Sequence, residues 1–291
     1  MTLERTLLYV ALGLAVSGVF VALWLRHAVQ SGAKLAWPTP VQLAIGAVTD
    51  FFDTLGVGSF ATTTSLYKLG RLVADENIPG TLNVGHAVPT FAEAFIFILV
   101  IDVDPWTLAS MIAAATAGAW FGAGRVSSWP RRWIQLGMGG LLLVAAAIIV
   151  ARLTNTIPGG GDARALSGAR LGIGLAGNFV LGALMTLGIG LYAPCMILVS
   201  FLGMNQTVAF PIMMGSCAFL MPAASVQFIR SGRYDLRAAL GLTIAGTPAA
   251  LVAGLLVKSL PLTAVKWMVV AVVVYTAVAM LRSAGEEKRG R

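Results

Sequence analysis

Charged residues are scarce in this chain: they make up 11% of its 291 residues, against about 25% in ordinary soluble domains. The hydrophobic share is 58%, and the mean hydropathy is +0.85. Several apolar runs approach the roughly 20 residues that a helix needs to cross a bilayer. These proportions exclude a soluble globular protein and predict an all-α polytopic membrane protein.

Cysteine is almost absent, with two residues, Cys195 and Cys217, both in apolar surroundings. This scarcity excludes a disulfide framework and any cysteine cluster with the spacing of a metal site. The apolar run over about residues 7–25 lacks the polar region and small-residue cleavage site that end a secretory signal. We therefore expect it to be retained as the first transmembrane helix.

Glycine, by contrast, is plentiful, with 33 residues, and one glycine-containing segment occurs twice. Residues 54–61 read Thr-Leu-Gly-Val-Gly-Ser-Phe-Ala, and residues 186–193 read Thr-Leu-Gly-Ile-Gly-Leu-Tyr-Ala, with five of eight positions identical. Other pairs keep nearly the same spacing, among them Asp104 and Asp235. The duplication predicts two homologous repeats.

Each repeat begins with an apolar stretch that its glycines interrupt, over about residues 41–69 and 171–202. In the first, limbs of about residues 41–55 and 58–69 are too short to cross ~30 Å at ~1.5 Å per residue. We predict a re-entrant hairpin of two half-helices, and a single long tilted span is the alternative. Three full spans follow in each repeat, over about residues 81–101, 106–124 and 133–151, then 207–229, 236–257 and 263–281.

The predicted organisation has five parts: an N-terminal transmembrane helix and linker, repeat 1, a linker, repeat 2 and a cytoplasmic tail, at residues 1–34, 38–152, 153–167, 168–284 and 285–291. If each hairpin returns to its own side, a repeat crosses the membrane an odd number of times, so the repeats are inverted. With the N-terminus outside and the C-terminus inside, 14 of the 20 Lys and Arg residues face the cytoplasm. The positive-inside rule favours this topology.

The net charge of +8 arises from basic residues in short loops, which is typical of topology signals and not of a nucleic-acid surface. We expect the lipid bilayer and a small substrate as partners, and no nucleic acid. Inverted repeats with interrupted helices are the usual architecture of secondary transporters, whose site lies at the repeat interface. The chain is predicted to be a transporter and not an enzyme, without a cofactor, and the sequence does not fix its oligomeric state.

The glycine segments are the first candidate for the substrate site, because opened backbone inside a membrane must be buried in protein or line a cavity. A half-helix that begins after Gly58 or Gly190 would direct unpaired N–H groups and the positive helix end at that cavity, which suits an anion. Alternatively, these small residues only allow close helix packing. The predicted substrate-binding residues follow the two segments: Thr54, Gly56, Gly58, Ser59, Thr62 and Thr63, then Thr186, Gly188, Gly190, Tyr192, Pro194 and Cys195.

Three acidic residues and one histidine lie within the predicted spans: Asp50, Asp53, Glu93 and His86. Such groups are costly in a membrane and usually face a cavity or a partner, so we predict that they couple transport to a proton gradient. A sodium gradient is the alternative. An aspartate can also cap a hairpin backbone, and His86 can be a satisfied interior side chain. If the aspartates bind the substrate, the cargo is a cation.

The two cysteines support a hypothesis from another class, a transmembrane thiol relay through Cys195 and Cys217. Such a relay needs the two thiols within exchange distance of each other. Prolines, including Pro89 in the first full span, are predicted to kink their helices and to free carbonyl groups that neighbouring helices must satisfy.

The duplicated Gly-x-Gly segments, the repeats of roughly 115 residues and the Pro-Gly-rich connector between them resemble the sulfite exporter TauE/SafE family of bacterial membrane permeases. The resemblance covers about residues 41–281. It implies movement of small sulfur-containing anions, such as sulfite, sulfoacetate or related organosulfonates, across the cytoplasmic (inner) membrane. The family typically has a proline after the glycine segment. Here the second copy has Pro194, whereas the first has Thr62.

Overall fold

The computed structural model describes residues 3–32, 35–122, 131–154, 161–257 and 262–289, and every regular element in them is a helix. The described residues of the first half form the helices α1 to α7 and the short 3-10 helix η1. Their bounds are Leu3–Gln30 (α1), Pro40–Thr54 (α2), Ser59–Gly70 (α3), Asp75–Asn77 (η1), Ile78–Gly85 (α4), Ala87–Val100 (α5), Pro105–Gly122 (α6) and Arg131–Leu153 (α7).

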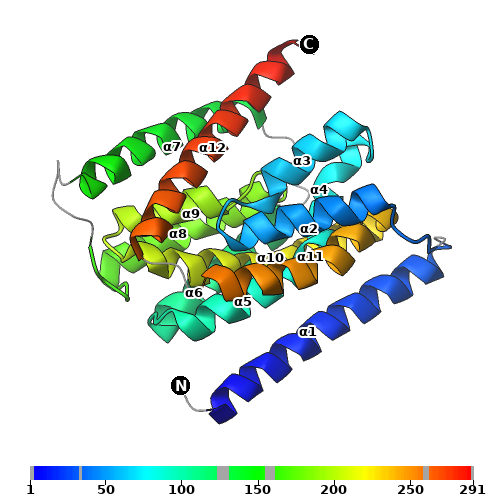
Figure 1. Ribbon diagram of the computed structural model, residues 1–291, viewed down its shortest axis with the longest axis horizontal. Helices are drawn as coiled ribbons and strands as arrows, with labels where there is room; N and C mark the ends of the chain where they lie inside the picture. Colours follow the sequence, from blue (N-terminus) through cyan, green and yellow to red (C-terminus); the bar gives the residue numbers. More distant parts are fainter. Residues whose placement is uncertain (1–2, 33–34, 123–130, 155–160, 258–261, 290–291) are drawn as a thin grey trace.

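The second half contains α8 to α12 and the 3-10 helix η3. Their bounds are Gly168–Met185 (α8), Tyr192–Phe201 (α9), Gln206–Val208 (η3), Ala209–Ser231 (α10), Leu236–Val257 (α11) and Leu262–Arg289 (α12). Figure 1 shows these helices as an elongated bundle, with most helices running along its long axis. The all-α fold expected from composition is therefore confirmed.

Three helices in the described part of the chain are long and apolar enough to cross a membrane: residues 168–185, 206–231 and 236–256. The pair formed by residues 75–85 and 87–100 counts as a fourth if the bent pair is one span. Several other helices are apolar but shorter, or include residues outside those described. Composition and helix length together support a membrane protein.

The span expected over residues 81–101 is not one straight helix, because α4 and α5 meet at an angle of 42° beside His86. Pro89 explains the bend, since a proline lacks the N–H group and its ring clashes with the carbonyl four residues earlier. That carbonyl belongs to Gly85, and it accepts a hydrogen bond from the Thr243 hydroxyl of α11 at 2.8 Å. The neighbouring helix thus satisfies the group that the kink frees.

Both interrupted stretches break at their glycines. α2 ends at Thr54 and α3 begins at Ser59, while α8 ends at Met185 and α9 begins at Tyr192. Gly56, Gly58 and Gly188 have φ angles of 91°, 83° and 79°, a region that side chains disfavour. Gly190 is not among the glycines with positive φ, so the two breaks differ in backbone although their sequences match.

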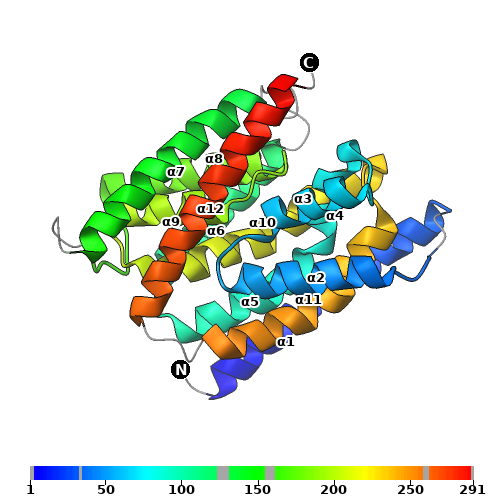
Figure 2. The ribbon, with the colours of Figure 1, turned by 45° about the horizontal axis from the view of Figure 1, so that its top comes forward.

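The first broken pair begins and ends at one end of the bundle. Before α2, the Trp37 carbonyl accepts a hydrogen bond from Arg237 Nε at 2.7 Å, and in α3 the Tyr67 hydroxyl donates to the Ala238 carbonyl at 3.4 Å. Both partners lie in the first turn of α11. The chain therefore leaves this region through α2 and returns to it through α3, as Figure 2 also shows.

The second broken pair begins and ends at the opposite end. The Ala163 carbonyl, before α8, accepts a hydrogen bond from the Asn205 N–H, after α9, at 2.9 Å. α10 connects the two ends, since it starts close after Asn205 and finishes just before α11. The two broken pairs thus enter the bundle from opposite ends.

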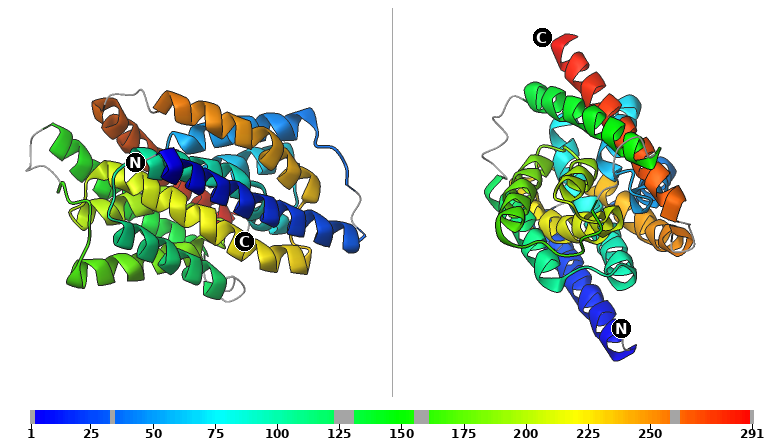
Figure 3. Two further views of the ribbon diagram at one scale, coloured as in Figure 1. Left: turned by 90° about the horizontal axis from the view of Figure 1, so that it is seen from below. Right: turned by 90° about the vertical axis from the view of Figure 1, so that its left-hand side faces the viewer.

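Close helix pairs surround the two breaks. α2 lies along α11, α8 lies along α6, and α7 pairs with α12. Glycines permit the close approach: a β-carbon on Gly46 of α2 would stand 2.6 Å from the Gly241 carbonyl oxygen of α11, and one on Gly122 of α6 would stand 2.7 Å from Ala183 Cα of α8. α1 lies on the outside of the bundle (Figure 3), where its buried Trp24 donates to the Tyr234 hydroxyl at 3.2 Å.

Candidate functional site

The two glycine breaks face each other in the middle of the bundle. A β-carbon added to Gly58 would lie 3.9 Å from Tyr192 Cβ, and one added to Gly190 would lie 3.7 Å from Phe60 Cβ. Gly58 and Gly190 are equivalent positions of the duplicated segment, and so are Phe60 and Tyr192. The contact is therefore reciprocal: the second glycine of each copy meets the aromatic residue of the other.

A cavity of about 90 Å³ lies between the breaks. It is lined by Asp53 of α2, by both glycine segments and by side chains of α7, α10 and α12. From the glycine segments come Gly58, Ser59, Gly188, Gly190 and Tyr192, and from the other helices come Gln135, Met221, Thr276 and Ser283. Because a single water needs about 10–15 Å³ in this measure, the cavity has room for a small polyatomic ion or a few waters.

Two polar atoms at the cavity wall have no hydrogen-bond partner within the described residues: Gln135 Oε1 and Thr64 Oγ1. Gln135 is buried, and its Nε2 donates to Ser283 Oγ at 3.2 Å. Buried polar groups are nearly always paired, so these two atoms are available to a ligand or to water in the cavity.

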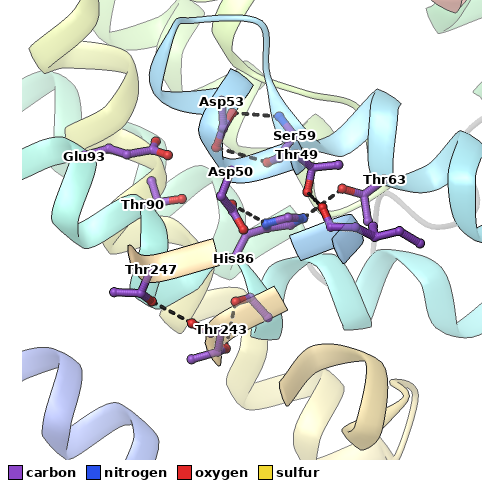
Figure 4. Close-up of polar contacts among 12 residues, drawn as sticks. Thr49, Asp50, Asp53, Ser59, Thr63, His86, Thr90, Glu93, Thr243 and Thr247 are labelled. Carbon is purple, nitrogen blue, oxygen red and sulfur yellow. Dashed lines mark hydrogen bonds and ion pairs between the residues drawn. The ribbon is translucent and has the colours of Figure 1, made fainter. Parts of the chain in front are cut away.

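The Asp53 side chain caps the N-terminus of α3. Its Oδ1 accepts from the Ser59 backbone N–H at 2.7 Å, and its Oδ2 accepts from the Ser59 hydroxyl at 3.1 Å (Figure 4). A carboxylate at this position interacts favourably with the positive end of the helix dipole. The aspartate cap that the sequence offered as a structural alternative is therefore present, while Asp53 also lines the cavity.

Glu93 of α5 lies beside Asp53 and is fully buried. Its Oε1 is 3.0 Å from the Thr54 hydroxyl oxygen, and its Oε2 is 2.9 Å from the Tyr192 hydroxyl oxygen. The same Tyr192 hydroxyl is 3.4 Å from Asp53 Oδ2. Tyr192 thus connects the second broken pair to Asp53 of the first broken pair and to Glu93 of α5.

Asp50 pairs with His86 at the α4–α5 bend. His86 Nδ1 lies 2.6 Å from Asp50 Oδ1, and His86 Nε2 lies 3.1 Å from the Thr63 hydroxyl oxygen (Figure 4). All three side chains are fully buried. When Asp50 is ionised, Nδ1 donates the hydrogen in this bond, because a carboxylate accepts but does not donate. The histidine is accordingly held by partners at both ring nitrogens.

Asp50, Asp53 and Glu93 form one acidic cluster. Each offers one carboxylate oxygen, and these oxygens all lie within 4.8 Å of one another. Buried carboxylates at this separation cannot all remain ionised without compensation, since each charge is removed from water and repels the others. The cluster can therefore hold protons or a cation.

The structure brings only part of the predicted substrate site to the cavity. Gly58, Ser59, Gly188, Gly190 and Tyr192 line it, and so does Asp53, which we had predicted for proton coupling. The other predicted substrate residues are not among the lining residues: Thr54, Gly56, Thr62, Thr63, Thr186, Pro194 and Cys195.

Some of these residues have local partners instead. The Thr62 hydroxyl donates to the Ser59 carbonyl at 2.8 Å, and the Thr186 hydroxyl donates to the Ala183 carbonyl at 2.7 Å. Thr54 and Thr63 contact the ionisable residues, as described above. The threonines of the broken helices therefore bond to their own backbone, to Glu93 or to His86 and do not line the cavity, a difference that spacing in the sequence did not reveal.

The cysteines are both free and buried. The Cys217 thiol donates to Met185 Sδ at 3.6 Å, a weak contact between two sulfur atoms of α10 and α8. Cys195 lies in the first turn of α9, directly after Pro194.

Sequence reasoning missed the wall that α7 and α12 contribute. Gln135, Thr276 and Ser283 are uncharged polar residues of α7 and α12, and their polarity within or beside the apolar runs is the signal that could have identified them. It also missed Gly246 of α11, where an added β-carbon would overlap Asp50 Oδ2. The space for Asp50 is therefore provided by a residue almost 200 positions away.

Comparison with known proteins adds no identity. No protein-family model, no curated protein and no solved structure matches this chain.

Proposed function

We propose that this protein is a secondary transporter that moves small sulfur-containing anions across the cytoplasmic membrane by alternating access, coupled to protons. The proposed substrates are sulfite, sulfoacetate or related organosulfonates, following the resemblance to the TauE/SafE permeases. The observation that carries the transport proposal is the cavity between the two glycine breaks, with an acidic cluster directly behind it.

The arrangement of helices supports an inverted repeat. The two broken pairs enter from opposite ends, and each first limb packs on a helix of the other half, α2 on α11 and α8 on α6. α6 and α11 occupy matching places in the two predicted repeats, as do α2 and α8. In this proposal, both broken pairs are re-entrant hairpins, and the N-terminus lies outside and the C-terminus inside.

The start of α9 supports an anion as the substrate. No side chain among the described residues caps this helix end, and Leu191, Tyr192 and Ala193 there line the cavity. The Pro194 ring, which lacks an N–H, is tolerated in this first turn. At α3 the corresponding end is already occupied by Asp53. The anion would therefore bind at the α9 side, and rocking of one repeat against the other would expose it to each side in turn.

A second candidate is a cation transporter. The observation that favours it is the approach of Asp50, Asp53 and Glu93 within 4.8 Å, because three buried carboxylates provide hard oxygen ligands for a cation. In that case the cluster would bind the cargo, and the cavity would be its entry route.

Flux measurements in proteoliposomes test these proposals. We expect uptake of labelled sulfite or sulfoacetate that increases with an imposed pH gradient. Gly58→Leu and Gly190→Leu should abolish it, because a leucine at either position enters the contact between the breaks. Gly140→Leu in α7 is the matched control, since an added β-carbon there meets nothing within 4 Å.

Absence of flux for both anions, or full activity in both cavity variants, would reject anion transport through this site. Flux of Na⁺ or another cation without any anion dependence, abolished by Asp50→Asn, would support the cation alternative instead.

A further inference from the structure

The Thr54 hydroxyl has more contacts than it has hydrogens. Its oxygen lies 2.9 Å from the Asp50 backbone carbonyl and 3.0 Å from Glu93 Oε1. A hydroxyl carries one hydrogen and two lone pairs, so it donates one of these bonds and must accept any second one. The carbonyl can only accept. If both bonds form, Thr54 donates to the carbonyl and Glu93 supplies the other hydrogen.

The other hydrogen-bond donors nearby do not supply the hydrogen that the contact between Thr54 and Glu93 lacks. Six polar contacts link Thr54, Ser59 and Tyr192 to the Asp50 carbonyl and to the carboxyl groups of Asp53 and Glu93, and only four hydrogens are available from those donors. One hydrogen on Glu93 completes every contact of 3.1 Å or shorter. The contact that remains is the longest, Tyr192 to Asp53 at 3.4 Å.

The charges around the site place this hydrogen on Glu93 and not on Asp53. Asp53 has the Ser59 N–H and the positive end of α3, which favour a carboxylate, whereas Glu93 contacts only hydroxyl groups. Asp50 has His86, which can balance its charge. Glu93 is the remaining buried acid of the cluster, and an uncompensated charge there is expensive.

Ionisable groups reach Glu93 from each helix that contributes to the cluster. Asp50 and Asp53 come from α2, Tyr192 from α9 and Cys217 from α10. His86, at the α4–α5 bend, contacts Asp50 of this cluster. α11 also packs on α5, and its titratable residue among those described, Arg237, is exposed in the first turn. Arg26 and His27 of α1 likewise lie in its last two turns. Among the described residues of these helices, the basic group close to the cluster is His86, and it is already paired with Asp50.

We infer that Glu93 is a neutral carboxylic acid in this conformation, that its hydrogen is donated to Thr54, and that it is the proton carried by the transporter. The transport role rests on the proposed function, whereas the protonation itself does not. Tyr192 is the positioning residue, because it lines the cavity and donates to the other oxygen of Glu93. A bound substrate that displaces α9 would therefore change the hydrogen bond to the protonated group.

Infrared difference spectroscopy of the purified protein at neutral pH tests the protonation without any substrate. We expect the C=O stretch of a protonated carboxyl group, sensitive to D₂O, that is lost in Glu93→Gln. Asp53→Asn should retain the band, and so should Asp75→Asn, which changes an exposed carboxylate. No such band in the wild type, or a band lost in Asp53→Asn and kept in Glu93→Gln, would overturn the inference.

Two further variants keep the test decisive if Glu93→Gln does not fold. Thr54→Val removes the acceptor of the hydrogen at nearly constant volume, and Tyr192→Phe removes the donor to the other oxygen. Each should shift the frequency of the band without abolishing it. A band that is unaffected by both variants does not belong to Glu93 and refutes the assignment.

Transport measurements separate this inference from the proposed function. Glu93→Gln should retain exchange of labelled sulfite or sulfoacetate across the membrane but lose accumulation driven by a pH gradient. A wild-type protein that shows the band without any anion flux refutes the proposed function alone. A wild-type protein that shows pH-driven flux without the band refutes the proton assignment alone.

Discussion

Asp50 of α2 and Gly246 of α11 are in direct contact, and a β-carbon at position 246 would overlap Asp50 Oδ2. This oxygen has no hydrogen-bond partner among the described residues, while Oδ1 is bound to His86 at 2.6 Å. The matching contact in the other half joins Gly182 of α8 to Ala115 of α6. Each contact thus contains one glycine, on opposite members of the helix pair, and the glycine on α11 is what leaves room for an acidic side chain on α2.

Replacement of Gly246 by alanine should therefore destabilise the protein or displace Asp50. Overpacking of a close contact costs about 1–3 kcal/mol. In an Asp50→Ala background the cost should largely disappear, because the overlapping atom is absent; a double-mutant cycle of unfolding in detergent measures this coupling. Gly140→Ala is the control, since its side chain meets nothing within 4 Å. Equal costs of Gly246→Ala in both backgrounds would contradict the contact.

The two glycine breaks should respond differently to alanine. Gly58 has φ 83° and ψ 120°, a conformation that is strained for any residue with a side chain, at about 1–3 kcal/mol. Gly190 lacks a positive φ, and an added β-carbon meets Phe60 Cβ at an ordinary 3.7 Å. Gly58→Ala should accordingly lower the melting temperature more than Gly190→Ala. A larger loss for Gly190→Ala would contradict this difference in backbone conformation between the two glycines.

A thiol relay predicts that both cysteines are essential, whereas the transporter proposal predicts that neither is. Cys217 contacts Met185 Sδ, and Cys195 is not among the cavity-lining residues. The double variant Cys195→Ala, Cys217→Ala should keep anion flux close to that of the wild type after correction for protein amount. Loss of flux in this variant, with the protein still folded, would favour the relay.

Asp104, in the loop before α6, should make stability depend on pH. The Thr107 N–H and hydroxyl both donate to its Oδ2 at 2.8 Å, and these bonds lower the pKa of Asp104 below its ordinary value of 3.8. The stabilisation is therefore present above pH 3.8 and is lost as the pH falls through the lower, folded value.

Asp104→Ala should lower the melting temperature at neutral pH, and the difference from wild type should shrink below about pH 4. Asp75→Ala is a suitable control, because the exposed Asp75 side chain forms a long surface ion pair with Lys68 at 3.9 Å. A difference for Asp104→Ala that stays constant down to acidic pH would indicate that the carboxylate charge does not contribute.

Local sequence determined the helices and their interruptions. Apolar runs of defined length predicted α6, α7 and α11 to within a few residues, and the paired glycines predicted the breaks before Ser59 and Tyr192. These features depend on backbone propensity and hydrophobicity, which act over a few residues. Pro89 signalled a kink, but its size and the Thr243 hydroxyl that satisfies Gly85 depend on a helix far away in the chain.

The sequence predicted several residues of the site but not how they are arranged. His86 and Glu93 are seven residues apart, which places two residues on one face of a straight helix. The bend beside His86 instead gives them different partners: Asp50 and Thr63 for the histidine, Thr54 and Tyr192 for the glutamate. No spacing in the sequence indicated that Tyr192 would contact Asp53 and Glu93.

By itself, the sequence determined that this is an all-helical, membrane-type chain with two glycine breaks and buried acids, because hydropathy and glycine conformational freedom are properties of short segments. The tertiary structure alone decided that the breaks meet across one cavity, that Asp53 occupies the start of α3 and that Gly246 makes room for Asp50. These relationships join residues up to about 200 positions apart. They depend on which helices pack together. Helix packing is decided by the fit between two helix surfaces, and the sequence pattern of a single helix does not reveal that fit.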